Sequence, residues 1–450
     1  MRPGRLAIGA LALLCTASAP AAASEGVPIV PVHPGMIAPF ALLLLSIAVV
    51  PFINRHFWEK SYPAFAGVLG AVTLVYYLFF IHNAPRVLLT AHEYFSFIVL
   101  IGSLFVVAGG IHIRISGTAT PGENVLSLLL GAVLSNVLGT TGASMVLIRP
   151  YIRANRARIK PYHVIFFIFI VSNIGGALTP IGDPPLFLGY LKGIPFFWII
   201  GRVSHIWLLA LLAVIGVFYV IDRLHFRKAP AEVRVRARRS REDFEFTGMH
   251  NLIFLSAIIG AVFIQHPLYL REAIMIAASV ASYMTTKPSI HHQNEFNFTP
   301  IKEVAILFAG IFASMIPALD WLELNGDALG LRTPAHFYWL TGSLSAVLDN
   351  APTYLTFLSA AFGLHNLSVD DPHQMSLFLT QHPHFVLAIS IAAVFFGAMT
   401  YIGNGPNFMV KSIAEQSRIH CPTFFGYVIK YSVPVLLPIF LAVALIFFRT

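Results

Sequence analysis

Charged residues are scarce in this sequence. Asp, Glu, Lys and Arg together make up 11% of the 450 residues, whereas hydrophobic residues make up 57%. A soluble globular chain carries about 25% charged residues. Because so few charges cannot cover a water-facing surface, the composition excludes a set of soluble domains. It predicts instead an all-α polytopic membrane protein whose helices face lipid.

Cysteine and catalytic motifs are also nearly absent. The chain has only Cys15 and Cys421, which leaves no basis for a disulfide framework or a Cys-based metal cluster. None of its 18 His residues forms a pair with metal-ligand spacing inside an apolar run. The phosphate-loop motif Gly-x4-Gly-Lys-Ser/Thr and the hydrolase motifs Gly-x-Ser-x-Gly and His-Glu-x-x-His do not occur. We therefore expect neither an enzyme nor an ATP-driven pump, and no cofactor.

The first residues have the pattern of an export signal. Arg2 and Arg5 precede a short apolar core, Leu6–Leu14, and the small-residue stretch Ala17–Ser24 follows. This order is typical of a signal peptide, so cleavage is predicted over residues 1–24. The alternative is an uncleaved first helix. Either way the following segment is placed on the periplasmic side of a bacterial inner membrane.

The remaining apolar runs predict about ten transmembrane helices and two further segments that do not cross. Residues 121–149 and 335–363 each have a polar centre, and each arm of about 12 residues spans only about 18 Å of helix. Such an arm cannot cross the roughly 30 Å hydrocarbon core. Both segments are therefore predicted to be re-entrant hairpins whose tips lie near the midplane.

Two other apolar segments are interrupted by Gly and Pro. The predicted broken helices cover 162–198 and 384–420, with the breaks at Thr179–Pro185 and Thr400–Pro406. The two halves thus repeat the same order: three spans, a hairpin, a broken helix and a final span. We pair Asn136 of the first hairpin with Asn350 of the second.

The repeat predicts three regions after the signal peptide. The first repeat covers 25–222, a basic cytoplasmic linker covers 223–249, and the second repeat covers 250–450. Five crossings per half place the second repeat upside down relative to the first. Inverted repeats with paired broken helices are typical of secondary transporters. Kinks without function are the alternative, but they would not explain two matching breaks.

The distribution of basic residues supports this topology. Most of the 29 Lys and Arg residues fall in loops that the topology places in the cytoplasm, as the positive-inside rule requires. The net charge of +9 therefore indicates a lipid bilayer as partner and no nucleic acid. The basic residues of the opposite side are Arg86, Lys192, Arg202, Arg271, Arg332 and Arg449.

The polar residues at the four interruptions form the candidate ion-binding site. Free backbone carbonyls at broken helices, together with Ser, Thr and Asn oxygens, suit a hard cation such as Na+. The two halves would build one site at their interface. Its candidate residues are Ser135, Asn136, Thr140, Thr141, Thr179, Gly182, Asp183, Asp349, Asn350, Thr353, Thr400, Gly403 and Asn404.

Asp183 and Asp349 are the candidate proton-coupling residues. An ionisable group inside a bilayer is costly and is a functional candidate by default. A carboxylate at a helix break can hold Na+ when ionised and release it when protonated, and this competition alone gives antiport. The alternative is that each Asp caps a half-helix.

The remaining charged residues of the apolar segments have simpler interpretations. Glu93 and Glu123 are expected to cap the helices that they begin. Lys192 is expected to reach the membrane interface with its head group, and attraction of an anionic substrate is the alternative. Asp320 flanks a span near its end.

Five phrases resemble the ion transporter superfamily, which contains NhaD-type Na+/H+ antiporters, arsenite permeases and citrate or dicarboxylate transporters. The strongest similarity is to its NhaD-related, citrate-transporter-like group. The phrases begin at His92 (His-Glu-Tyr-Phe-Ser-Phe-Ile), Ser135 (Ser-Asn-Val-Leu-Gly-Thr-Thr-Gly-Ala), Asn173 (Asn-Ile-Gly-Gly-Ala-Leu-Thr-Pro-Ile-Gly-Asp-Pro-Pro), Asp349 (Asp-Asn-Ala-Pro-Thr) and Tyr401 (Tyr-Ile-Gly-Asn-Gly-Pro-Asn).

The resemblance implies a homodimer with a scaffold and a moving transport part that works as an elevator. Dicarboxylate members carry Ser-Asn-Thr at each hairpin tip, which holds Na+ and a substrate carboxylate. Here Val137 replaces the Thr of the first tip, and Asp349-Asn350-Ala351 stands at the second. Because an ionised Asp repels a carboxylate, we expect Na+ or Li+ exchange with protons. Na+-coupled citrate or dicarboxylate symport is the alternative, followed by arsenite or another oxyanion.

Overall fold

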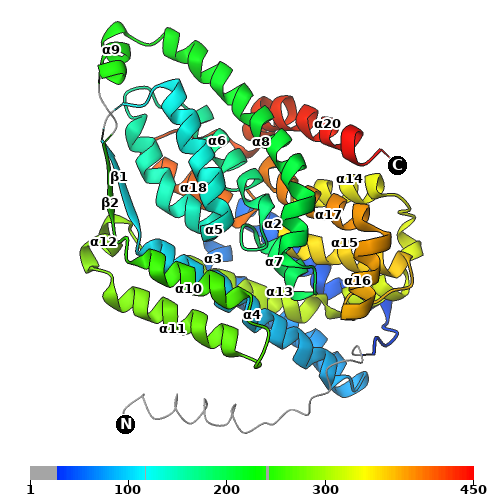
Figure 1. Cartoon of the computed structure of the whole chain (residues 1–450). Coiled ribbons are helices and arrows are strands. Elements are labelled where there is room, and N and C mark those ends of the chain that lie inside the picture. The colour runs from blue at the N-terminus through cyan, green and yellow to red at the C-terminus, as the bar shows by residue number, and fades with distance from the viewer. Residues whose placement is uncertain (1–27, 117, 240–242, 450) are drawn as a thin grey trace, which may run out of the picture.

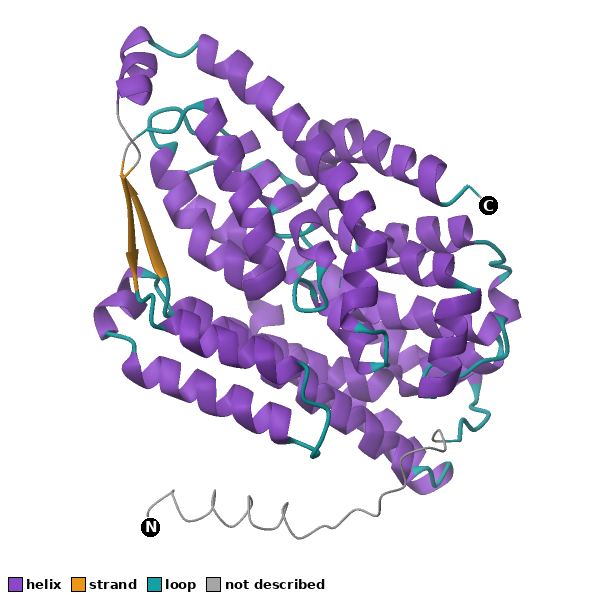
Figure 2. Cartoon of the chain, viewed as in Figure 1, coloured by secondary structure: helices purple, strands orange, loops and turns teal. Residues whose placement is uncertain are grey.

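The structure is a computed structural model, which describes residues 28–116, 118–239 and 243–449. The described chain is almost entirely helical, as the composition predicts (Figure 2). The predicted signal peptide, 1–24, lies outside the described residues.

The elements of the first half are mostly helices. Proline stands in the first turn of many of them, where its missing N–H costs nothing and its fixed φ suits a helix. The elements are η1 Pro34–Ile37, α2 Ala38–Ile53, α3 Arg55–Val75, η2 Tyr76–Phe80, α4 Ala84–Gly109, β1 His112–Ser116, α5 Pro121–Ala154, α6 Pro161–Ile170, η3 Ile174–Leu178, α7 Pro184–Leu191, α8 Phe196–Arg227 and α9 Ala231–Arg239.

The second half is also mostly helical. They are β2 Asp243–Thr247, α10 Asn251–Val262, α11 Leu270–Thr285, α12 Pro288–Gln293, α13 Thr299–Leu324, η4 Gly326–Leu329, α14 Pro334–Ser345, α15 Asn350–Leu364, α16 Pro372–Gln381, α17 Pro383–Phe396, η5 Gly397–Met399, α18 Gly405–Gln416, α19 Phe424–Tyr427, η6 Val428–Leu436 and α20 Leu437–Phe447.

Several helices of the described chain are candidate membrane spans. Eight helices are long and apolar enough to cross a membrane, or nine if the pair α16 and α17, bent by 95°, is one broken span. The expected number was about ten. The difference lies partly in α10 and α11, whose 12 and 16 residues fall short of the length needed for a straight crossing.

Helix α5 is one of the eight by length, yet it folds back on itself. Gly139 interrupts it with φ +74° and ψ 156°, a conformation that glycine adopts without the strain a side chain would bring. The N–H of Ala119, just before the helix, donates to the carbonyl of Ala154 at its end, at 2.9 Å. The two ends therefore meet on one side, and the tip lies at Gly139.

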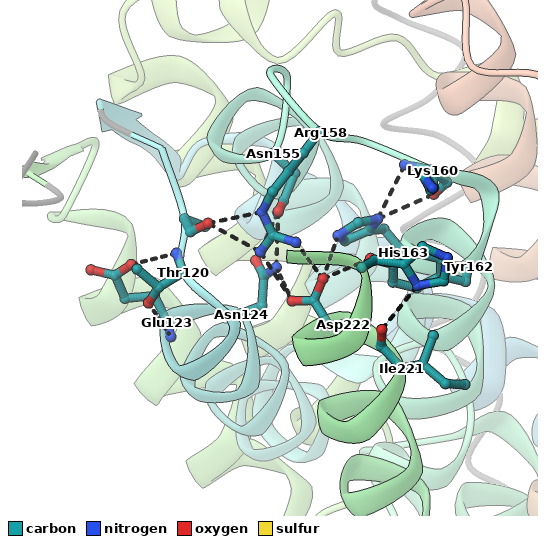
Figure 3. A network of polar contacts seen from close by, with 12 residues as sticks. Thr120, Glu123, Asn124, Asn155, Arg158, Lys160, Tyr162, His163, Ile221 and Asp222 are labelled. Atoms are coloured by element: carbon teal, nitrogen blue, oxygen red, sulfur yellow. Dashed lines mark hydrogen bonds and ion pairs between the residues drawn. The ribbon is translucent and has the colours of Figure 1, made fainter. Parts of the chain in front are cut away.

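A buried polar network joins the two ends of this folded helix to α8 (Figure 3). The Asp222 carboxylate accepts hydrogen bonds from Tyr162 Oη at 2.7 Å and Asn124 Nδ2 at 2.9 Å. It also forms an ion pair with Arg158, while the side-chain amides of Asn124 and Asn155 bond each other at 2.7 to 2.9 Å. The base of the hairpin is thereby fixed to the end of α8.

The second predicted hairpin and both predicted broken helices coincide with interrupted elements. Helices α14 and α15 pack against each other across a break at residues 346–349. The first broken segment consists of α6, η3 and α7, and the second consists of α17, η5 and α18. Helix α7 ends at Leu191 and α8 begins at Phe196, so the first broken segment stops short of the predicted residue 198.

By their contacts the helices form two groups, and Figure 1 shows α4, α10 and α11 of the first group side by side. Helices α2, α3, α4, α10, α11 and α13 contact one another and form the scaffold group. The site group contains α5, α6, α7, α8, α14, α15, α17, α18 and α20. The groups meet where α4 packs on α5 and α7 and where α13 packs on α15. The four interruptions all belong to the site group.

A short β-ribbon was not expected from the sequence. Strand β1 pairs antiparallel with β2, with Ile113 opposite Phe246 and Arg114 opposite Glu245. The ribbon links the loop after α4 to the predicted basic linker, and α9 occupies much of that linker. The linker is therefore structured on both sides of the undescribed residues 240–242.

Candidate functional site at the four helix breaks

Asp183 lies at the centre of the four interruptions. Its carboxylate accepts hydrogen bonds from Thr140 Oγ1 at 2.7 Å, Asn350 Nδ2 at 2.5 Å and Asn404 Nδ2 at 2.9 Å. Thr140 belongs to the first hairpin tip, Asn350 to the second, and Asn404 to the second broken helix. One predicted residue from each interruption therefore meets here, and Asp183 is only 1% exposed.

The side chain of Asp183 does not cap α7. The residue occupies the N-cap position, but its carboxylate makes no hydrogen bond to the helix backbone. Asn404 occupies the same position before α18 and likewise makes no side-chain cap. Both side chains are thus free to point at each other. The capping alternative is wrong for Asp183.

The first hairpin is tied to the first break by Asn136. Its Nδ2 donates to Gly175 O at 2.6 Å, while its Oδ1 accepts from the N–H groups of Leu178 at 3.0 Å and Thr179 at 3.2 Å. Thr179 Oγ1 returns a bond to Asn136 O at 2.7 Å. Asn136 therefore satisfies backbone groups that the broken helix leaves free, and its amide has no capacity left for an ion.

Ser135 and Gly182 add two contacts to this joint between the first hairpin and the first broken helix. Ser135 Oγ lies 2.7 Å from Val171 O, and the Thr140 N–H donates to Gly182 O at 2.7 Å. A Cβ on Gly182 would lie 2.1 Å from Gly176 O, closer than any real side chain. Glycine is therefore required where the two sides of the break touch.

The second half repeats these bonds. Ser345 Oγ donates to Ala393 O at 2.6 Å, and Thr400 Oγ1 donates to Ala346 O at 2.5 Å. The Gly403 N–H donates to Thr400 Oγ1 at 3.2 Å, as the Gly182 N–H does to Thr179 Oγ1 at 3.1 Å. Ser345 thus takes the place of Ser135, and Ala346 the place of Asn136.

This register corrects the predicted pairing of Asn136 with Asn350. Asn350 is the counterpart of Thr140, because each donates from a hairpin tip to Asp183. The sequence held the signal, since Ser-Asn-Val-Leu-Gly-Thr at 135–140 and Ser-Ala-Val-Leu-Asp-Asn at 345–350 share Ser, Val and Leu at the same positions.

Asp349 takes the place of the glycine at the first tip. Its Oδ1 accepts from the Ala351 N–H at 3.0 Å and caps α15. Thr353 Oγ1 bonds back to Asp349 O within the helix at 2.8 Å. Neither of these bonds reaches the Asp183 carboxylate. The capping alternative holds for Asp349.

Two asparagines that the site prediction omitted join the broken helices. Asn173 Nδ2 donates to Asn407 Oδ1 at 2.7 Å, and Asn407 Nδ2 donates to Gly397 O at 2.8 Å and Thr400 O at 2.9 Å. Asn404 Nδ2 also reaches Ser172 O at 3.0 Å. Asn173 and Asn407 both lie in the sequence phrases that resemble the ion transporter superfamily, so the sequence already placed them beside the breaks.

A small cavity of about 30 Å³ opens beside Asp183. Gly139, Thr140, Thr141 and Gly182 line its polar side, and Leu104 and other apolar residues of α4 line the opposite side. This volume holds about two water molecules. It accommodates a partly hydrated small cation in this conformation.

The site has an excess of acceptors over positive charge. Asp183 receives bonds only from neutral groups, and no ion pair to it occurs among the described residues. Asn350 Oδ1 is buried and has no hydrogen-bond partner. A buried carboxylate without a countercharge is unfavourable unless a cation or a proton joins it.

Of the interpretations of the other charged residues, two are confirmed and two are wrong. Glu123 caps α5 in a capping box with Thr120, as expected. Glu93 lies within α4 and is buried, so it is no cap. Lys192 is buried at 7% exposure, and its ammonium group pairs with Glu93 and Asp370 instead of reaching an interface. Asp320 is buried too, and it lies near the end of α13, as expected.

Comparison with known proteins identifies the family. A protein family described as "Putative citrate transport" matches residues 31–448. Two proteins described as uncharacterized transporters, from Mycobacterium bovis and Mycobacterium tuberculosis, are each 23% identical over 310 residues, which is 65% of this chain and 68% of the relative. The family is one of transporters and not of enzymes, and this chain belongs to it as a secondary transporter.

Proposed function

We propose that this transporter exchanges Na+ or Li+ for protons at Asp183. The observation that carries the proposal is the convergence of four helix interruptions on one buried carboxylate that lacks a countercharge. The cation would lie against Asp183, with Thr140, Thr141 and the unpartnered Asn350 Oδ1 as neutral oxygen ligands. Hard cations such as Na+ prefer oxygen ligands of this kind.

Exchange follows from competition at the carboxylate. An ionised Asp183 attracts the cation, and protonation removes that attraction and releases it. One site that carries either a cation or a proton, but not both, gives antiport once it faces the two sides in turn. Asp349 would add a second negative charge near the tip of the second hairpin and share the proton coupling.

Na+-coupled citrate or dicarboxylate symport is the second candidate. The description of the family favours it. Two features disfavour it: an Asp at the centre of the site and another at the second tip would repel carboxylates, and the cavity of about 30 Å³ is smaller than any di- or tricarboxylate. No Lys or Arg contacts Asp183 among the described residues.

The resemblance to the superfamily suggests how the site would change sides. The scaffold group would stay fixed in a homodimer, and the hairpins and broken helices of the site group would move against it as an elevator. The proposed orientation places the N-terminus of the mature chain in the periplasm of a bacterial inner membrane. The separation of the helices into two packed groups supports this division.

The test is proton movement in proteoliposomes that contain the purified full-length protein and a pH-sensitive dye. NaCl, LiCl, KCl and citrate are added in turn. Antiport predicts a rapid pH change with Na+ or Li+ that Asp183→Asn abolishes. Na+-dependent uptake of labelled citrate, with no response to cations alone, would replace antiport by the second candidate.

A further inference from the structure

A buried cluster of six charged side chains lies apart from the Asp183 site, where the scaffold group meets the site group. Its members come from α4, the end of α7, α13 and the loop after α15. They are Arg86, Glu93, Lys192, Asp320, Glu323 and Asp370. The side chains of the five members that form its ion pairs are at most 9% exposed, and Glu323 is 6% exposed as a residue.

Asp370 holds the cluster together. It forms ion pairs with both Arg86 and Lys192. Arg86 also pairs with Asp320 at 2.6 Å, and Lys192 pairs with Glu93 at 2.7 Å. The hydroxyl of Tyr77 donates to the second oxygen of Asp320 at 2.7 Å.

Glu323 has no cation of its own. Its two oxygens accept only from Ser359 Oγ at 3.4 Å and the Val369 N–H at 3.3 Å, which are long for bonds to a carboxylate. Four acids thus face two bases, so full ionisation would leave two uncompensated negative charges. Burial of such an excess is strongly unfavourable, and bound protons remove it.

Glu93 connects this cluster to a neighbouring cavity. Besides its bond to Lys192, it lines a cavity of about 240 Å³ between α4, the end of α7 and the α10–α11 loop. The other ionisable groups that line this cavity are His92, Tyr190, Tyr269, Arg271 and Glu272, and Glu272 forms an ion pair with Arg271 at 2.7 Å. A proton can reach the cluster from this cavity by way of Glu93.

Helix α7 links the cluster to the cation site. Asp183 is its N-cap residue and Lys192 is its C-cap residue, so a single helix of 8 residues carries both. The ion pair of Lys192 with Glu93 joins α7 of the site group to α4 of the scaffold group. A change of charge in the cluster therefore acts on the element that positions Asp183.

We propose that this six-residue cluster is a second proton-binding site of the transporter, with Glu93 exchanging protons through the cavity and Glu323 holding a proton in the interior. The site is separate from the site where cation and proton compete. The proposal rests on the proposed antiport function only for the role that a proton bound at this second site has during transport. Proton binding by the cluster itself can be measured without transport.

Infrared difference spectroscopy of the purified full-length protein near neutral pH tests the proposal directly. Protonated carboxylic acids have a C=O stretch that carboxylates lack and that shifts in D2O. We expect this band in the wild type, with partial loss in both Glu93→Gln and Glu323→Gln. Glu272→Gln is the matched control, since Glu272 lines the same cavity but is ionised beside Arg271, and it should keep the whole band.

Three results would overturn the proposal: no carboxylic acid band in the wild type, a band that both cluster variants retain in full, or a band that disappears in Asp183→Asn alone. A wild type that shows the cluster band but no response to Na+ or Li+ in proteoliposomes would leave this site in place and remove the antiport function. The two ideas therefore fail separately.

Discussion

Asp183 differs from every other carboxylate of the described chain in its surroundings. Asp222 lies beside Arg158 and Asp320 beside Arg86, and buried Glu323, which has no such partner among the described residues, accepts only two long bonds. Asp183 instead receives three bonds from neutral side chains on three other elements. This environment orients a negative charge without neutralising it, which is what a reversible cation site requires.

Replacing Asp183 with Asn tests this difference by exchanging one carboxylate oxygen for an amide nitrogen. Asp183→Asn preserves the shape of the side chain and removes its charge, so we expect Na+-induced proton movement to fall by about 100-fold or more, which corresponds to about 3 kcal/mol of lost cation binding. Asp349→Asn retains an N-cap residue of equal quality and should cost less than about tenfold. Equal loss in both variants would contradict the assignment of Asp183 as the principal site.

Competition between Na+ and protons also fixes the direction of the pH dependence. As pH falls, more of the site is protonated and more Na+ is needed to displace the proton. The apparent KM for Na+ should therefore rise, by about tenfold per pH unit once the protonated form dominates, while the rate at saturating Na+ changes less. Initial rates measured across a series of Na+ concentrations at each pH check this, and a KM independent of pH would rule out a shared site.

At the scale of elements, the decisive features are the joints between hairpins and broken helices. Each joint repeats the same three bonds: a Ser to a carbonyl, a Thr to a hairpin carbonyl, and a Gly N–H to that Thr. Backbone groups released at the breaks are thereby satisfied within the protein. Non-helical backbone at membrane depth requires this.

Gly182 and Gly405 provide a matched pair for testing a joint. A Cβ at position 182 would lie 2.1 Å from Gly176 O, whereas a Cβ at position 405 would meet nothing within 4 Å. Gly182→Ala should therefore separate the two sides of the break, lower the melting temperature and abolish exchange, at a cost of about 2 kcal/mol or more. Gly405→Ala should change stability by less than about 1 kcal/mol. Thermal melts and dye assays on both variants decide the matter.

At the scale of the whole molecule, the buried charge cluster joins the two helix groups. Removing a base should therefore destabilise the protein far more than removing an excess acid. Lys192→Met leaves Glu93 and Asp370 with less compensation and should destabilise the protein by about 3–5 kcal/mol. Glu323→Gln removes an acid that has no cation and should change stability by less than about 1 kcal/mol. Melting temperatures of the purified variants in one detergent compare them, and a large loss in Glu323→Gln would mean that its charge is compensated.

Much of the fold follows from the sequence, because lipid allows few solutions. Apolar length identifies helices, and Gly or Pro within apolar runs identifies breaks such as those at Thr179–Pro185 and Thr400–Pro406. Asp183 and Asn404 were predicted as site residues from these breaks, and Thr140 and Asn350 from the polar centres of the two hairpins, since polar groups at such depth are costly without a function. The matching order of spans, hairpin and broken helix also predicted that the second half of the chain repeats the first.

The tertiary structure decided which of these residues meet and which charges compensate one another. Sequence treated Asp183 and Asp349 alike, but packing directs one carboxylate at three donors and the other at its own helix. It treated Glu93, Lys192 and Asp320 as separate residues near helix ends, and only the approach of α4, α7 and α13 brings them into one cluster. The physical reason is that burial and charge balance are properties of neighbours in space, whereas the sequence gives local periodicity and composition.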